Sequence, residues 1–409
     1  MMKTVLLILF IAAACVSTAA QDEALQFKMP PVPERAAAPE GFVPKDWRLL
    51  GKAAGDLNGD GRADAAVVAA HDAEGSGPED VWEEPRLLVI ALGEESGGLR
   101  LSVASDAVVL CRGCGGVFGD PFEAIDVERG TLVIRHYSGS RDRWGFIDRF
   151  RLQDGRWTHI GATERHTDTL DCSYFEERDA NLITGLVIES GKMGRSSYNR
   201  TFYELRAALI ERAPAVDGAA SAGEWGDPHV VRLAAKEQVA VGTALWRGAD
   251  DASARLSASW RGGELYLRAE VADDSVTPGD AVRLISKTGQ VVRPVEMKSA
   301  PREGGYAVEA RYTLKSLGLE ELEAQIRELR GYAADKDISG DLPLRVSVEV
   351  IDEDAGQKTA SVLSTSRGGR KYPARVRLTR HAGLPLLSDF DRESSGDVLP
   401  PPGFGVARP

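Results

Sequence analysis

Short segments in which apolar and polar residues alternate are the feature of this sequence that most constrains its fold. A period of two places successive side chains on opposite faces of a β-strand, so each such segment predicts a strand with one buried face. The clearest alternation covers residues 265–271, and others cover 131–137, 146–152 and 344–350. The turn residues Asp154-Gly155 and Arg261-Gly-Gly263 join neighbouring segments into hairpins. The pattern therefore predicts a mainly β protein.

Length and composition predict two domains. With 409 residues, the chain exceeds what one ordinary hydrophobic core requires. The clearest composition shift is the Ala-, Gly- and Pro-containing stretch at 211–223, where we place the boundary. Leucines at helical spacing predict one amphipathic helix at 316–330. The expected order is a signal peptide at 1–20, a Pro/Ala-rich linker at 21–45, a β-rich (α+β) domain at 46–210, a β-sandwich at 211–383 and a disordered tail at 384–409.

The first 20 residues have the pattern of an export signal. Lys3 precedes an apolar run at 5–16, and small residues follow at 17–20. We expect a periplasmic or secreted protein, with lipid anchoring through Cys15 as the less favoured alternative. No later apolar run has the length of a transmembrane segment. The net charge of −12 argues against a nucleic-acid partner, which requires a basic face.

The segment Asp56-Leu-Asn-Gly-Asp-Gly-Arg-Ala-Asp64 has the donor spacing of a calcium loop. Side-chain oxygens fall at loop positions 1, 3, 5 and 9, and Gly61 permits the sharp turn around a cation. Val67 occupies position 12, where an EF-hand has a bidentate Glu, and residues 65–70 have the composition of a strand. The sequence therefore predicts a Ca²⁺ loop that leads into a strand.

These residues resemble the FG-GAP or integrin-type calcium repeat, which has the pattern Asp-x-Asn-x-Asp-Gly-x-x-Asp followed by an aliphatic strand. The resemblance implies that Ca²⁺ is bound by the side chains of Asp56, Asn58, Asp60 and Asp64 and by the carbonyl of Arg62. Such repeats recur to build a propeller, whereas this sequence has one copy, which argues against that architecture. We expect the ion to stabilise a hairpin rather than to hold a ligand.

Three cysteines follow the signal: Cys111, Cys114 and Cys172. An oxidising compartment favours a disulfide, either between Cys111 and Cys114 or from one of them to Cys172. Two alternatives are a redox-active Cys-x-x-Cys pair and a zinc site that combines these two cysteines with Cys172 and with His136 or His166.

Several short motifs of the second half resemble family 9 carbohydrate-binding modules and the related DOMON-type sandwiches over residues 215–380. They include Asp217-Gly, Glu224-Trp225, Gly279-Asp280 and Leu314-Lys-Ser-Leu-Gly318. The resemblance implies a jelly-roll-like β-sandwich that binds sugars at one end.

A sugar site combines flat aromatic rings with groups that hydrogen-bond to hydroxyls. The ligand-binding residues expected in the sandwich are Trp246, Tyr266 and Tyr306. Trp260 is in phase with Leu256 and is expected in the core instead.

No catalytic motif is evident, so we expect a binding protein rather than an enzyme. The first hypothesis is an exported, calcium-stabilised protein that binds a polysaccharide or glycan through the second domain. The alternatives are a non-catalytic envelope protein that binds other proteins, and an exported thiol redox or metal protein that uses Cys111 and Cys114. Residues 111–171 also resemble a group of uncharacterised exported bacterial proteins with one such calcium loop, a likeness that implies no activity.

Overall fold

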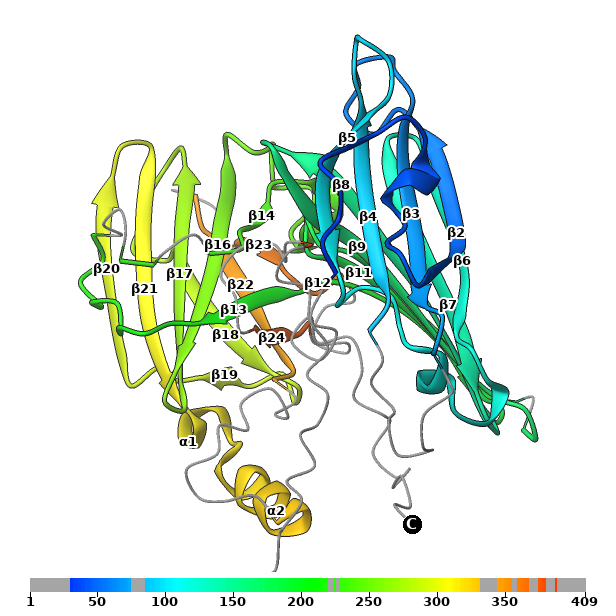
Figure 1. Cartoon of the computed structure of the whole chain (residues 1–409). Coiled ribbons are helices and arrows are strands. Elements are labelled where there is room, and N and C mark those ends of the chain that lie inside the picture. The colour runs from blue at the N-terminus through cyan, green and yellow to red at the C-terminus, as the bar shows by residue number, and fades with distance from the viewer. Residues whose placement is uncertain are drawn as a thin grey trace, which may run out of the picture.

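The structure, a computed structural model, describes residues 30–74, 85–171, 173–219, 224–225, 228–331, 344–354, 359–367, 374–379 and Leu387. The expected signal peptide, Cys15, Cys172 and all of the expected tail except Leu387 lie outside these residues. The fold is mainly β, as predicted, with four sheets and short helices (Figure 1).

The first sheet has five antiparallel strands in the order β1-β5-β4-β3-β2. They are β1 (Arg35–Ala36), β2 (Trp47–Gly55), β3 (Asp64–His71), β4 (Leu87–Gly93) and β5 (Leu99–Ser105). The 3₁₀ helix η1 (Pro39–Phe42) places the fully buried Phe42 against apolar side chains of β3 and β4. Residues 35–42, which belong to the expected linker, pack on the first sheet, because Phe42 covers a sheet face that would otherwise be exposed.

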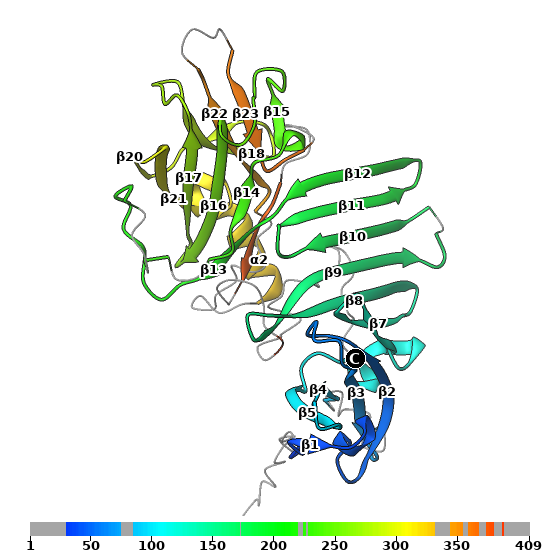
Figure 2. The same ribbon diagram turned by 90° about the horizontal axis from the view of Figure 1, so that it is seen from above.

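The second sheet is a seven-stranded antiparallel meander in which each strand pairs with the next one along the chain (Figure 2). Its apolar side chains Ile134 and Phe150 pack with Val68 and Ile90 of the first sheet in one core. The 3₁₀ helix η2 (Arg112–Phe118) precedes it. The strands are β6 (Phe122–Glu128), β7 (Thr131–Gly139), β8 (Asp142–Gln153), β9 (Arg156–Asp168), β10 (Phe175–Asn181), β11 (Leu186–Met193) and β12 (Ser196–Tyr203).

The third and fourth sheets form a sandwich around a second large core. The hairpin predicted around 261–263 is present as β16 and β17, and Trp260 is 1% exposed in the core, as predicted. The third sheet contains β13 (Leu205–Leu209), β14 (Val231–Leu233), β16 (Ala252–Arg261), β17 (Glu264–Asp273), β20 (Glu296–Arg302), β21 (Gly305–Thr313) and β24 (Val376–Thr379). The fourth contains β15 (Val239–Val241), which follows η3 (Lys236–Gln238), and β18 (Ala281–Ser286), β19 (Val291–Val292), β22 (Val346–Asp352) and β23 (Ser361–Ser364).

Strand β13 connects the meander to the sandwich. It follows β12 after the single residue Glu204 and runs parallel to both β16 and β24. The composition shift at 211–223 therefore begins after a strand that already hydrogen-bonds within the third sheet.

The expected single helix at 316–330 is two helices, α1 (Leu314–Leu317) and α2 (Glu320–Arg330). Gly318 ends α1 in the left-handed conformation, with φ of 69°, and its N–H donates to carbonyls of that helix. Leu329 belongs to the apolar face that the leucine spacing predicts, but its side chain is 86% exposed. The buried face of α2 is therefore smaller than the spacing predicts. No helix in the described ranges is long and apolar enough to cross a bilayer.

Candidate functional site

The expected calcium loop closes the β2–β3 hairpin, in which Gly55 pairs with Asp64. The Asp56 carboxylate accepts hydrogen bonds from the backbone N–H groups of Gly59, Asp60 and Gly61, at 2.7, 3.2 and 2.9 Å. These bonds, that of Gly61 first, lower the pKa of Asp56. Asp56 thus organises the loop as an anion.

Asp64 ties the same loop to the neighbouring strand. Its buried carboxylate accepts from the N–H of Leu57 at 2.7 Å and from the N–H of Gly93 on β4 at 2.8 Å. Asp60 accepts from the Arg62 N–H at 2.8 Å and forms an ion pair with its guanidinium.

The loop presents the all-oxygen donor set that calcium prefers. However, Asp56, Asp60 and Asp64 do not form a group in which one oxygen from each lies within 4.8 Å of the others, as three other acidic groups of the described chain do. Calcium binding by Asp56, Asn58, Asp60, Asp64 and the Arg62 carbonyl therefore stays a prediction.

Cys111, the residue before η2, and Cys114 of η2 form a disulfide, as one of the predicted alternatives had it. Cys111 is buried, and its carbonyl accepts from the Cys114 N–H at 3.1 Å. Because both sulfurs are bonded to each other, neither is a thiolate that could bind zinc in this state. His136, a ligand in the zinc alternative, accepts from the Leu110 N–H through Nε2 at 3.2 Å.

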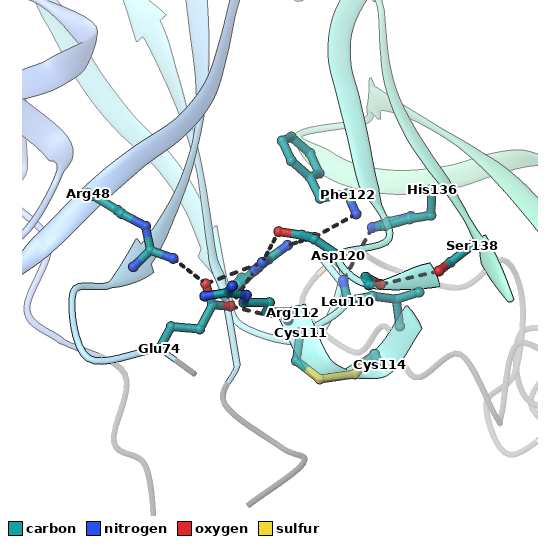
Figure 3. A network of polar contacts seen from close by, with 12 residues as sticks. Arg48, Glu74, Leu110, Cys111, Arg112, Cys114, Asp120, Phe122, His136 and Ser138 are labelled. Atoms are coloured by element: carbon teal, nitrogen blue, oxygen red, sulfur yellow. Dashed lines mark hydrogen bonds and ion pairs between the residues drawn. A yellow bond between two sulfur atoms is a disulfide. The ribbon is translucent and has the colours of Figure 1, made fainter. Parts of the chain in front are cut away.

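A buried arginine, Arg86, anchors the disulfide loop to the first sheet. Figure 3 shows its two partners, Glu74 and Asp120, near the disulfide loop. The fully buried Arg86 binds Glu74, with Nε to Oε1 at 2.6 Å, and Asp120, with Nη2 to Oδ2 at 2.6 Å. Glu74 also binds Arg48 at 2.6 Å and accepts from the Arg112 N–H at 3.3 Å. Two carboxylates and two guanidinium groups thus hold η2 in place, which offsets the cost of burying Arg86.

Beside the disulfide lies an exposed apolar knob formed by Val117, Phe118 and Tyr137. These side chains are 91%, 54% and 41% exposed. The rings of Phe118 and Tyr137 meet edge to face with centroids 5.8 Å apart, and the Arg143 guanidinium lies 3.7 Å from the Phe118 centroid.

The three aromatic residues expected to bind a ligand in the sandwich are not gathered together. Tyr306 pairs with Val271 and belongs to the core, whereas Tyr266 pairs with Arg311 and lies on the opposite face of the third sheet. Tyr266 is buried and donates to Glu264 at 2.6 Å, and burial raises the pKa of Tyr266 to about 12. Trp246 is half-buried and donates through Nε1 to the Ala252 carbonyl at 2.8 Å. Their role in ligand binding stays a prediction.

A different set of aromatic and polar side chains is aligned across the meander. We call Trp144, His166, Glu176 and Tyr198 the aromatic row. Strand register places them in one line. Trp144 of β8 pairs with His166 of β9, and His166 pairs with Glu176 of β10. Gly191 of β11 comes next in this line, because it pairs with Glu176 on one side and with Tyr198 of β12 on the other. All four are half-buried, and strands β8 to β12 lie side by side in Figure 2.

The aromatic row combines flat rings with hydrogen-bonding groups. The Trp144 ring stacks on Phe146 with centroids 4.9 Å apart, so Phe146 fixes its orientation. Tyr198 donates to Glu176 at 2.7 Å, and burial, followed by this contact, raises the pKa of Tyr198. The phenol is therefore protonated at neutral pH and remains a hydrogen-bond donor.

Histidine and tyrosine extend the polar side of the row. The His166 Nδ1 lies 3.5 Å from an Asp142 carboxylate oxygen. Burial, and then the charge of Glu176, raises the pKa of Tyr174, which keeps this phenol protonated as well. The sequence did not identify this site, because strand register alone brings together residues from 144 to 198.

Comparisons with known proteins assign no family. No family model and no curated protein matches the sequence. Two solved structures of a carbohydrate-binding module family 9 protein from Caldicellulosiruptor kristjanssonii, in complex with glucose and with cellotriose, are similar to part of the chain. The glucose complex has a TM-score of 0.30 and 12% identity, and the match covers 44% of this chain and 97% of the other. The cellotriose complex has a TM-score of 0.29 and 13% identity, and the match covers 44% of this chain and 95% of the other. A likeness this weak transfers neither family nor ligand.

Proposed function

We propose that this protein is a non-catalytic saccharide-binding protein and that the aromatic row is its binding face. The observation that carries the proposal is the alignment of Trp144, His166, Glu176 and Tyr198 across five strands. Neighbouring strands lie about 4.8 Å apart, so the row extends over roughly 19 Å. This length suits an oligosaccharide better than a single sugar ring.

The chemistry of the row supports a sugar ligand. The apolar face of a pyranose stacks on an aromatic ring, and Trp144 presents a ring whose orientation is fixed by Phe146. Sugar hydroxyls need both donors and acceptors, which Tyr198 and Glu176 supply side by side.

Export and calcium binding complete the proposal. We propose that residues 1–20 direct the chain out of the cytoplasm, because polysaccharides are accessible outside it. We also propose that Ca²⁺ stabilises the β2–β3 hairpin. The sandwich, with the half-buried Trp246, is the competing location for the sugar.

The experiment is a glycan array with the full chain, followed by calorimetry with the best ligand. Trp144→Ala and Tyr198→Ala are expected to abolish binding. Phe175→Ala is the matched control, because Phe175 is an exposed aromatic residue adjacent to Glu176 on the opposite face of β10. Loss of binding in Trp246→Ala, with binding retained in Trp144→Ala and Tyr198→Ala, would show that the site lies in the sandwich. A folded wild-type protein that binds no glycan would overturn the proposed function.

The apolar knob supports a second candidate function, the binding of another protein in the envelope. Val117 and Phe118 expose apolar surface of the kind that protein interfaces bury. Crosslinking in intact cells with wild type and Phe118→Asp tests it: a crosslinked partner that is lost in Phe118→Asp favours this function, and identical crosslinks in both exclude it.

A further inference from the structure

Three aspartates meet where the chain crosses from the third sheet to the fourth. Asp273 ends β17, Asp280 directly precedes β18, and Asp352 ends β22, the strand that pairs with β18. Each contributes a carboxylate oxygen, and these three oxygens all lie within 4.8 Å of one another. The crossover therefore brings carboxylates from both sheets to one point.

Each of these carboxylates is held by a neighbouring group. Asp273 Oδ1 accepts from the Ser275 N–H at 2.7 Å, and Asp280 Oδ1 accepts from the Glu353 N–H at 2.8 Å. Asp352 Oδ2 accepts from the Ser361 hydroxyl at 2.8 Å. The carboxylates are thus oriented in advance, which lowers the entropy lost when they bind a ligand.

Three polar atoms at this point are buried without a hydrogen-bond partner in the described chain. They are Asp273 Oδ2, Asp352 Oδ1 and the hydroxyl of Tyr306, from residues only 6%, 5% and 6% exposed. Tyr306 lies on β21, beside β17. Tyr306 pairs with Val271, which lies two residues before Asp273 on the same face of β17, so register places Tyr306 at the same end of the third sheet. Unpartnered buried polar groups are costly unless a ligand satisfies them.

An adjacent acidic group shows how this end of the sandwich balances charge. Asp251, Asp274 and Asp354 also converge, and Arg247 forms ion pairs with all three. Among the residues that the structure describes, no arginine, lysine or histidine forms an ion pair with the Asp273 group. Two groups of three aspartates thus lie close in the chain, and the positive charge of Arg247 is paired with only one of them.

We infer that Asp273, Asp280 and Asp352 bind a hard divalent cation, with Tyr306 beside it. Oxygen-only donors select calcium or magnesium over zinc or copper. The ion offsets two of the three negative charges and joins the end of β17 to the start of β18 and the end of β22. The site is separate from the expected loop at 56–64, and it does not depend on sugar binding.

Calorimetric titration of the chelator-treated full chain with calcium tests the inference, and magnesium is titrated in parallel. The protein titrated carries the double substitution Asp56→Asn/Asp60→Asn, which removes the expected loop site. This protein is expected to bind one divalent cation, and addition of Asp273→Asn is expected to abolish that binding. Asp274→Asn, in the group that pairs with Arg247, is the matched control and is expected to retain cation binding.

A spectroscopic measurement covers the case in which Asp273→Asn fails to fold. Terbium bound at this site is expected to emit on excitation of tyrosine, and Tyr306→Phe is expected to reduce the emission while one cation still binds. Absence of cation binding by the folded loop variant, or unchanged binding after a folded Asp273→Asn exchange, would overturn the inference.

Discussion

Tyr198 on β12 donates a 2.7 Å hydrogen bond to Glu176 on β10 by reaching over the intervening strand β11. Gly191 of β11 makes this possible, because a Cβ at that position would lie 2.7 Å from the Tyr198 ring. A glycine thus opens the space in which the phenol and the carboxylate of the aromatic row meet.

Gly191→Ala is expected to displace the Tyr198 ring and break its bond to Glu176. A hydrogen bond to a charged group contributes about 1.5–3 kcal/mol, so we expect saccharide affinity to fall about tenfold or more in calorimetry. Ser190→Ala is the control, because Ser190 lies on the opposite face of β11. Equal affinity in both variants would show that the Tyr198–Glu176 pair does not contact the sugar.

Calcium is expected to slow amide hydrogen exchange in the β2–β3 hairpin. The diagnostic amides are those of Gly59, Gly61 and Leu57, which donate to Asp56 and Asp64. Exchange is measured with calcium and with excess chelator, and the core amide of Trp260 is the internal reference. If chelation leaves the three loop amides unchanged, the calcium assignment of residues 56–64 is wrong.

Reduction of the Cys111–Cys114 disulfide is expected to lower the free energy of unfolding by about 2 kcal/mol, the chain-entropy value for so short a loop. Urea unfolding with and without reductant measures this change. Cys111→Ser/Cys114→Ser is the control and is expected to be insensitive to reductant. Thiol titration of residues 21–409, denatured without reductant, is expected to find one thiol, that of Cys172.

His229 is expected to make stability depend on pH between about 6.5 and 4. Burial, and then the charge of Arg206, lowers the pKa of His229 from 6.5 to about 4. The unfolded chain therefore binds a proton that the folded chain excludes, so stability is complete above pH 6.5 and falls as the pH drops towards 4. The change corresponds to about 3 kcal/mol. Urea unfolding across this range measures it, and His229→Gln should remove this part of the profile.

Glu204 is expected to govern a lower pH range. Burial alone would raise the pKa of Glu204, but the charges of Arg178 and Arg377 outweigh it and lower the pKa from 4.5 to about 2. The stabilisation is therefore present above pH 4.5 and is lost as the pH falls towards 2. Glu204→Gln leaves both guanidinium groups without this anion, and we expect a loss of about 3–5 kcal/mol at pH 7. A loss below 1 kcal/mol in urea unfolding would contradict this role.

Local patterns predicted many of the strands but did not point to the aromatic row or to the Asp273 group. Alternation identified the β16–β17 hairpin and the buried Trp260, because both depend on neighbouring residues. The aromatic row depends on the register of five strands, and the Asp273 group depends on a crossover between sheets. The spacing of leucines also concealed Gly318, whose left-handed conformation divides the expected helix. Interactions between residues distant in sequence leave no local period to detect.

The position of β13 also determines how the protein behaves when it is cut. Cleavage at 211–223 would leave β13 on the N-terminal fragment and its partners β16 and β24 on the C-terminal fragment. β13 on one fragment would still hydrogen-bond with β16 and β24 on the other, so the two fragments are expected to remain associated after proteolysis. An isolated fragment from residue 215 onward would lack the strand that joins β24 to β16 and would expose the edges of both, so it is unsuited to separate study.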